Sequence, residues 1–182
     1  MKKIVSLFLI ILSYYSYSQE WTCGDALIDS RDSKSYSTVL IGEQCWMAEN
    51  LNIGAKIDAP TSQTDNSVIE KYCYDNDENN CNTYGGLYQW NEMMDYVATE
   101  GAQGICPDGW YVPSDYDFIA LEMYLGMDSA TAYITNGWRG NGVGTALKQG
   151  GSSGFNEILG GRYGGSFGFL NSYGYPYTST EY

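Results

Sequence analysis

The sequence predicts a single α+β domain, and three stretches of it lead to that prediction. Residues 104–118 place a Pro-Asp-Gly turn and a tryptophan directly in front of a helix start. Residues 25–48 alternate short β-prone runs with turn residues, as an antiparallel meander does. Residues 137–168 interleave many glycines with aromatic residues, which is typical of ordered loops and short strands rather than of flexible linkers.

Residues 1–18 have the pattern of a secretory signal. Two lysines precede an apolar run from Ile4 to Leu12, and a polar, small-residue exit follows it. The run is too short to span a bilayer. We therefore expect an exported protein, secreted or at the cell surface, with one domain over residues 19–182 and no transmembrane span.

The composition excludes several functions. The formal net charge is −13, and an acidic surface repels phosphate backbones, so nucleic acid is a poor partner. The chain contains no histidine, which removes Ser-His-Asp and Cys-His catalysis and every His-ligated metal. Eighteen tyrosines and five tryptophans indicate aromatic surfaces that could stack against sugars, although aromatic residues fill cores more often.

The five cysteines are expected to form disulfides, because the protein is expected to be exported. Cys73 and Cys81 would close a loop of about nine residues, worth roughly 2.5 kcal/mol, and a Cys23–Cys45 bridge would be worth roughly 3.4 kcal/mol. Cys106 is then left unpaired. The sequence does not choose among the pairings that five cysteines allow.

The N-terminal meander is expected to contain three strands. A polar turn over residues 29–34 separates the first strand from a second over residues 36–41, and a two-residue Gly-Glu connection leads to a third over residues 44–48. Strand alternation places Trp46 on the buried side. A polar, irregular surface loop is expected over residues 54–71.

A first helix is expected after Gly86. Apolar residues recur there at helical spacing, with Trp90 on the buried face. Glu92 and Asp95 fall on the opposite face and are expected to point to solvent. Trp90 is therefore predicted to belong to the structural core.

A second helix is expected to begin after Ser114. Ser114 can cap it and Asp117 can complete a capping box, while Leu121 lies on the apolar stripe. Gly126 offers a C-terminal stop. The preceding Pro-Asp-Gly turn is expected to direct the Trp110 side chain into the core and to lead the chain into this helix.

The segment between Cys73 and Cys81 imitates the start of a calcium loop, with Asp75, Asp77 and Asn79 at alternate positions. The sixth and twelfth positions are not the glycine and glutamate of an EF-hand, so that interpretation fails. Two alternatives remain: an irregular calcium site, or a solvated acidic loop closed by a disulfide. No other cofactor is expected.

Four blocks in order carry a resemblance to a known family. They are Thr38-Val39-Leu40-Ile41-Gly42-x-Gln44-Cys45-Trp46-Met47-Ala48-Glu49-Asn50-Leu51-Asn52, Tyr72-Cys73-Tyr74-Asp75-Asn76-Asp77, Tyr84-Gly85-Gly86-Leu87-Tyr88-x-Trp90 and Gln103-Gly104-Ile105-Cys106-Pro107-x-Gly109-Trp110. The chain resembles the Fibrobacter succinogenes major paralogous domain family from about Asp25 to Tyr182. That family consists of exported proteins of Bacteroidetes-type bacteria. The resemblance implies a C-type lectin-like fold, related to formylglycine-generating enzymes, with two helices, small antiparallel sheets and long glycine-rich loops.

The chain departs from the family pattern at two places. Tyr111 stands where the family usually has histidine, so no role of that ring is carried over. Family members also continue to a final strand with an Arg-Cys pair, which this chain lacks. The resemblance therefore implies that the C-terminal strand is missing and that Cys106 normally pairs with the missing cysteine. The reactive cysteine pair of the oxidase branch is not carried over either, since no cysteine follows Cys106.

The expected function is a non-enzymatic binding or adhesion module, with a protein or glycan ligand. Tyr173, Tyr175 and Tyr177 are the candidate stacking residues, with packing inward as the alternative. A carboxylate-based glycan hydrolase is a second hypothesis, since two acids suffice for that chemistry. Its candidate pairs are Glu92 with Asp95 and Asp115 with Asp117, although the first also suits a solvated helix face and the second a helix start. A purely structural surface protein is the third.

Overall fold

The computed structural model describes residues 21–135, 137, 139–140 and 142–181, so the expected signal over residues 1–18 lies outside the described residues. This part of the chain is α+β, as predicted. Its strands are β1 (Leu27–Ile28), β2 (Ser35–Tyr36), β3 (Thr38–Ile41), β4 (Gln44–Met47), β5 (Ala55–Lys56), β6 (Glu70–Lys71), β7 (Arg162–Tyr163) and β8 (Phe167–Gly168). Its helices are a 3₁₀ turn η1 (Tyr74–Asn76), α1 (Glu78–Tyr84), α2 (Trp90–Met93), α3 (Asp115–Tyr124), α4 (Ser129–Ala132) and α5 (Val143–Leu147).

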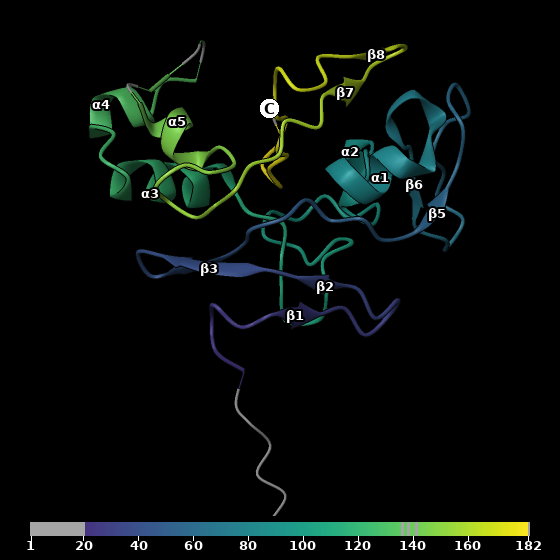
Figure 1. Ribbon diagram of the computed structural model, residues 1–182, viewed down its shortest axis with the longest axis horizontal. Helices are drawn as coiled ribbons and strands as arrows, with labels where there is room; N and C mark the ends of the chain where they lie inside the picture. The colour runs from purple at the N-terminus through teal and green to yellow at the C-terminus, as the bar shows by residue number, and fades with distance from the viewer. Residues whose placement is uncertain (1–20, 136, 138, 141, 182) are drawn as a thin grey trace, which may run out of the picture.

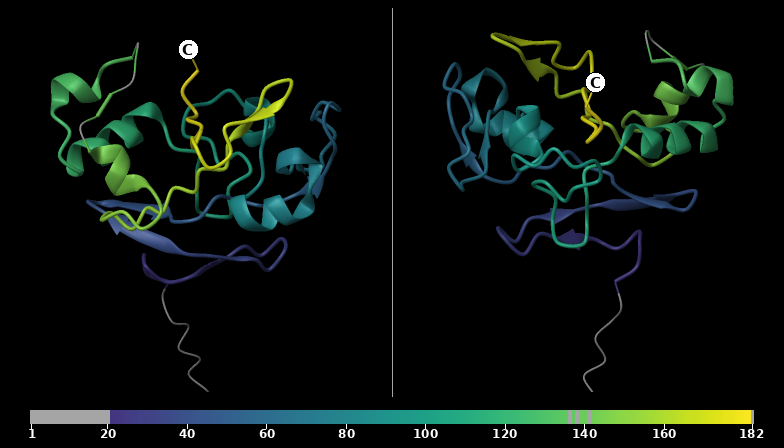
Figure 2. Two further views of the ribbon diagram at one scale, coloured as in Figure 1. Left: turned by 45° about the horizontal axis from the view of Figure 1, so that its top comes forward. Right: turned by 180° about the vertical axis from the view of Figure 1, so that it is seen from behind.

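Two groups of helices face each other across the C-terminal segment. α3, α4 and α5 lie on one side, and α1 and α2 with β5 and β6 lie on the other (Figure 1). The β1, β2 and β3 region forms a layer beneath both groups, and the last residues run between them (Figure 2). Residues far apart in the sequence therefore meet at the centre of the molecule.

The sheets are four separate two-stranded pairs, so the predicted continuous meander is wrong in that respect. β1 pairs with β2 and β3 with β4, both antiparallel, but β2 does not pair with β3. Gly42, at a φ of 63°, provides the left-handed backbone that the tight β3–β4 turn requires. β7 and β8 are also antiparallel, whereas β5 and β6 pair in parallel inside the predicted surface loop. The expectation that every small sheet would be antiparallel is therefore wrong for the β5–β6 pair.

α3 begins as the sequence predicts. Ser114 caps it, and both halves of the capping box with Asp117 are present. Leu121 is fully buried in its centre, against Ile41, Trp46 and Phe155. Beyond the helix, Gly126 at a φ of 102° ends it.

The first predicted helix is much shorter than expected. Only α2 forms there, because Asp95 and Tyr96 both adopt positive φ angles, which end the helix. Glu92 is buried rather than solvent-facing. Its carboxylate accepts hydrogen bonds from the Glu70 backbone N–H at 2.7 Å and from the Tyr96 hydroxyl at 2.8 Å. Burying this carboxylate is tolerated because it is satisfied by those donors.

Among the described residues the structure has five α-helices, not the two that the family resemblance implies. α1 begins within the segment predicted as an acidic loop, and α4 and α5 lie between Gly126 and the last strand pair. α5 interrupts the glycine-rich region, where Val143 packs in a cluster with Ile119, Met127 and Ala132. No described helix has the length and apolar character that a membrane crossing requires.

The C-terminal segment binds back onto the fold through polar contacts. The Trp90 indole N–H donates to the Thr178 carbonyl at 2.9 Å, and the Ser179 N–H donates to the Pro113 carbonyl at 2.8 Å. The Asp115 N–H at the start of α3 donates to the Thr180 hydroxyl at 2.9 Å. This segment therefore holds α2 and α3 in place on both sides of the molecular centre.

Candidate functional site

A cavity of about 490 Å³ lies between β4, α3 and the C-terminal segment. We call it the central cavity. Seven aromatic side chains line it: Trp21, Trp46, Trp110, Tyr111, Phe118, Phe155 and Tyr177. An apolar concave site with a few polar groups is the usual form of a ligand pocket.

Trp46 forms the floor of the central cavity. It is buried on β4, as predicted, and its ring lies 5.2 Å from that of Phe118 and 5.5 Å from that of Phe155. Its indole N–H is buried and no described residue accepts a hydrogen bond from it. An unsatisfied buried donor costs about 1–3 kcal/mol, which an acceptor from a ligand would offset.

Trp110 lies on the wall of the cavity, which corrects its prediction as a core residue. The turn after Pro107 does aim the ring inward, but the ring is only partly buried and packs edge-on against exposed Trp21 at 5.8 Å. Trp90, also predicted to be core, is partly buried against the cluster of Ile53, Met93, Met94, Ile105 and Val112. Of the three tryptophans predicted to be in the core, only Trp46 is buried; Trp90 and Trp110 are partly buried.

The polar groups of the central cavity are acidic or neutral. Glu43, Glu49, Asp117 and Glu157 line it, and no lysine or arginine is among its described lining residues. Two of these carboxylates already hold the fold together. Glu49 accepts from the Ser37 N–H at 2.8 Å, and Asp117 accepts from the Ser114 N–H at 2.8 Å within the capping box.

Glu157 differs from Glu49 and Asp117 because no described residue donates a hydrogen bond to its side chain, and it differs from the exposed Glu43 because it is partly buried. Its carboxylate lies so close to Gly174 that a Cβ at that position would fall 2.0 Å from Oε1. Burial without compensating partners raises the pKa of Glu157 to about 7. The group can therefore be either an acid or a carboxylate near neutral pH.

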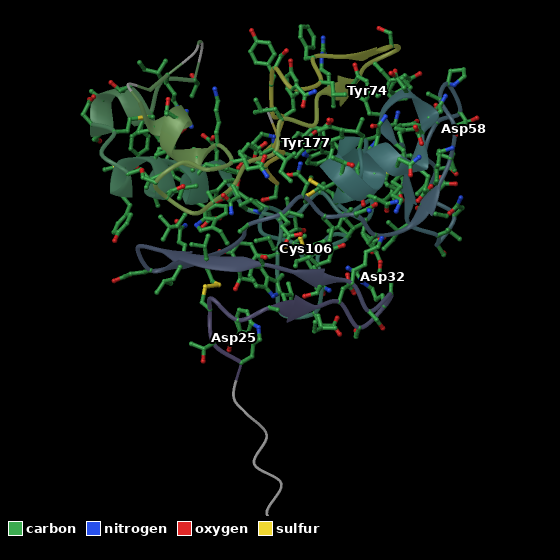
Figure 3. All side chains as sticks on the ribbon, in the orientation of Figure 1. Asp25, Asp32, Asp58, Tyr74, Cys106 and Tyr177 are labelled. Atoms are coloured by element: carbon green, nitrogen blue, oxygen red, sulfur yellow. A yellow bond between two sulfur atoms is a disulfide. The ribbon has the colours of Figure 1, made fainter. Side chains whose placement is uncertain are left out.

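A second cavity, of about 260 Å³, adjoins the first. We call it the tyrosine cavity because Tyr72, Tyr84, Tyr88, Tyr163, Tyr175 and Tyr177 line it. Cys106, Glu157 and Tyr177 line both cavities and so form a shared wall. Figure 3 places Cys106 and Tyr177 at the middle of the molecule, where the two cavities meet. We call these two adjoining cavities, taken together, the aromatic groove.

Comparison with known protein families shows which family the chain belongs to. The family model of the Fibrobacter succinogenes major domain matches residues 39–182 of this chain. The chain belongs to the Fibrobacter succinogenes major domain family. No curated protein and no solved structure matches it.

In this Fibrobacter succinogenes major domain, the cysteines pair in one of the ways that the sequence allowed. Cys23 is bonded to Cys45, and Cys73 to Cys81. Cys106 carries a free thiol and is partly buried. The two disulfides are typical of proteins outside the reducing cytoplasm.

The Cys106 thiol is expected to react slowly with alkylating reagents. Burial raises its pKa to about 11 from an ordinary value of 9.0, which lowers the reactive thiolate fraction at pH 8 by roughly 100-fold. Mass spectrometry after timed iodoacetamide treatment measures the rate, and the same protein in denaturant is the control. Equal rates in the folded and denatured protein would contradict the burial of this thiol.

The predicted calcium residues are used by helices instead. Asp77 is the N-cap of α1 and accepts from the Asn79 N–H and side-chain amide, both at 3.0 Å. Asp75 lies in η1 at a positive φ. Within the described residues, no group of three or more acidic or cysteine side chains is placed to share a metal ion.

Two of the three candidate stacking tyrosines, Tyr173 and Tyr175, pack against each other, and Tyr177 lies apart from them. Tyr173, Tyr175 and Tyr177 are all partly exposed, between 41% and 45%. Tyr173 and Tyr175 have ring centres 6.1 Å apart and both contact Phe169. Tyr177 separates from them and enters the shared wall of the two cavities.

Neither predicted carboxylate pair forms an open acidic site. Glu92 is buried and its carboxylate accepts two hydrogen bonds. Asp117 takes part in the capping box of α3, and the Asp115 carboxylate lies 3.6 Å from the Arg139 guanidinium. Asp117 lines the central cavity, but Glu157, the partly buried acid there that accepts no hydrogen bond from a described residue, was not predicted. Its only sequence signal is an acidic residue between Phe155 and Ile158 in a region otherwise rich in glycine.

Proposed function

We propose that this protein is an exported, non-enzymatic binding module that holds a glycan chain in the aromatic groove. The central cavity is the observation that supports the proposal most directly. Its flat apolar walls suit the C–H faces of sugar rings, while its carboxylates and amides can accept or donate to hydroxyl groups.

The charge of the cavity favours a neutral sugar over an anionic one at this position. Glu43 and Glu157 line it with no cation opposite them among the described residues. The groove continues into the tyrosine cavity, so an extended chain fits better than a single sugar. Export is supported by the two disulfides and by the signal-like pattern of residues 1–18.

Calorimetric titration with neutral oligosaccharides tests the proposal. Cellohexaose, xylohexaose and mannohexaose are suitable probes, and at least one is expected to bind. Trp110→Ala should weaken that binding by roughly 10-fold or more, since buried tryptophans dominate contact energies. Tyr116→Ala is the matched control, because Tyr116 is 65% exposed on α3 and outside the cavity. No binding to any probe, or equal losses in both variants, would refute the proposal.

A carboxylate-based glycan hydrolase is the second candidate, and Glu157 is the observation that favours it. A carboxyl group with a pKa of about 7 in an apolar cavity is suited to general acid catalysis. Hydrolysis also needs a second carboxylate across the sugar bond. Glu49 and Asp117 are engaged in backbone hydrogen bonds, which leaves the exposed Glu43 as the candidate for that role. Release of reducing ends that Glu157→Gln abolishes would favour this candidate over the binding module.

A further inference from the structure

Arg162 is a cation without a carboxylate partner in an acidic protein. Arg31, Lys34, Lys56 and Arg139 each form an ion pair with an aspartate or glutamate. No such pair involves Arg162 among the described residues, and no described residue accepts a hydrogen bond from its guanidinium. Lys71 and Lys148 also form no ion pair among the described residues, but neither of them lines the central cavity or the tyrosine cavity, whereas Arg162 lines the tyrosine cavity.

The guanidinium of Arg162 is held in place by aromatic rings. Its central carbon lies 5.3 Å from the centre of the Phe169 ring and 5.7 Å from that of Tyr175. Such cation–π contacts use the flat face of the group and leave its N–H edge available. The two rings are themselves 6.2 Å apart, and Arg162 in β7 pairs with Gly168 in β8, the residue before Phe169.

This arrangement belongs to the groove rather than to a separate surface. Arg162 and Tyr175 line the tyrosine cavity, which shares the Glu157 and Tyr177 wall with the central cavity. Arg162 is the only lysine or arginine among the described residues that line either cavity. The groove therefore has an acidic, aromatic end and an end with one positive charge.

We propose that the Arg162 end of the groove binds a carboxylate-bearing sugar, a uronate unit within the glycan chain, and this rests on the proposed function. The planar guanidinium presents two parallel N–H groups that match both oxygens of a carboxylate. Tyr173 and Tyr175, exposed at 41% and 42%, offer ring faces for the sugar itself. The neutral units of the same chain would occupy the central cavity.

An acidic peptide carries the same charge but fits these observations less well. A peptide carboxylate would use Arg162, but the continuous run of aromatic faces from Phe169 to the central cavity suits the repeated flat rings of a glycan better. The negative charge of the whole protein also disfavours a ligand with many charges. A single carboxylate set among stacked rings satisfies both features.

The test compares a uronate-containing oligosaccharide with its carboxyl-reduced, neutral counterpart of the same linkage and length. Calorimetry gives the affinity ratio of the two, and we expect the wild type to prefer the uronate chain by roughly 10-fold. Arg162→Gln should bring the ratio close to one, and Arg162→Lys should give an intermediate value because an ammonium lacks the planar fork. Lys148→Gln removes the same charge outside both cavities and should leave the ratio unchanged.

Each other outcome decides the question. Binding of both chains with equal affinity, or an unchanged ratio in Arg162→Gln, would overturn the uronate site while leaving the proposed function intact. Binding of neither chain would overturn the proposed function and the uronate site together. Competition by a glutamate peptide that is as strong as that of the uronate chain would assign the site to an acidic protein segment and overturn the inference.

Discussion

Glu157→Gln is expected to stabilise the folded protein by about 3 kcal/mol at pH 8 and to have little effect at pH 4. The ordinary pKa of this carboxyl is 4.5, and burial raises its pKa to about 7 in the folded protein. Because the folded state favours the protonated form, the wild type loses stability as the pH rises from about 4.5 to about 7, at 1.36 kcal/mol per unit of pKa difference. Glutamine is neutral throughout and avoids that loss.

Urea unfolding of both proteins at pH 4, 6 and 8 measures this effect as a difference, which cancels the titration of every other group. Glu43→Gln is the matched control, because it removes an exposed carboxylate from the same cavity and alters the net charge equally. A wild-type-to-variant difference that is constant across this pH range would show that Glu157 is not buried as described.

Leu121→Ala is expected to lower the free energy of unfolding by about 2–5 kcal/mol. The side chain is fully buried and joins α3 to Ile41, Trp46 and Phe155, so its removal leaves a cavity that the neighbours cannot fill. The space left by the Leu121 side chain would adjoin Trp46, which lines the central cavity. Equilibrium unfolding in urea gives its size.

Tyr124→Ala is the control for helix propensity, since Tyr124 is 67% exposed in the same helix. Surface substitutions of this kind usually change stability by less than about 0.5 kcal/mol. Equal losses in the two variants would mean that α3 is not anchored through Leu121.

Local signals in the sequence predicted the parts of the fold that depend on local chemistry. The capping box of Ser114 and Asp117 is such a case, because both partners lie within one helical turn. The stop at Gly126 is another, since only the backbone at that residue decides it. The β3–β4 hairpin followed from its two-residue turn for the same reason.

Distant contacts decided the features that were not predicted. The first helix ends early and Glu92 points inward, because its carboxylate is needed by the Glu70 backbone and the Tyr96 hydroxyl. The candidate groove is of the same kind, since β4, α3 and residues 176–177 approach each other only in the folded chain. Glu157 gained its raised pKa from that approach, so no pattern in its own neighbourhood could indicate it.

The bonds of Thr178, Ser179 and Thr180 have a consequence for when the protein folds. They reach residues between 65 and 88 positions earlier, including the first N–H group of α3. During synthesis from the N-terminus, those earlier groups therefore have to wait for residues 178–180 before their native partners exist. Contacts of such long sequence separation also slow folding, because the intervening loop must close first. A nascent chain would accordingly leave α2 and the start of α3 without these partners until residues 178–180 have been made.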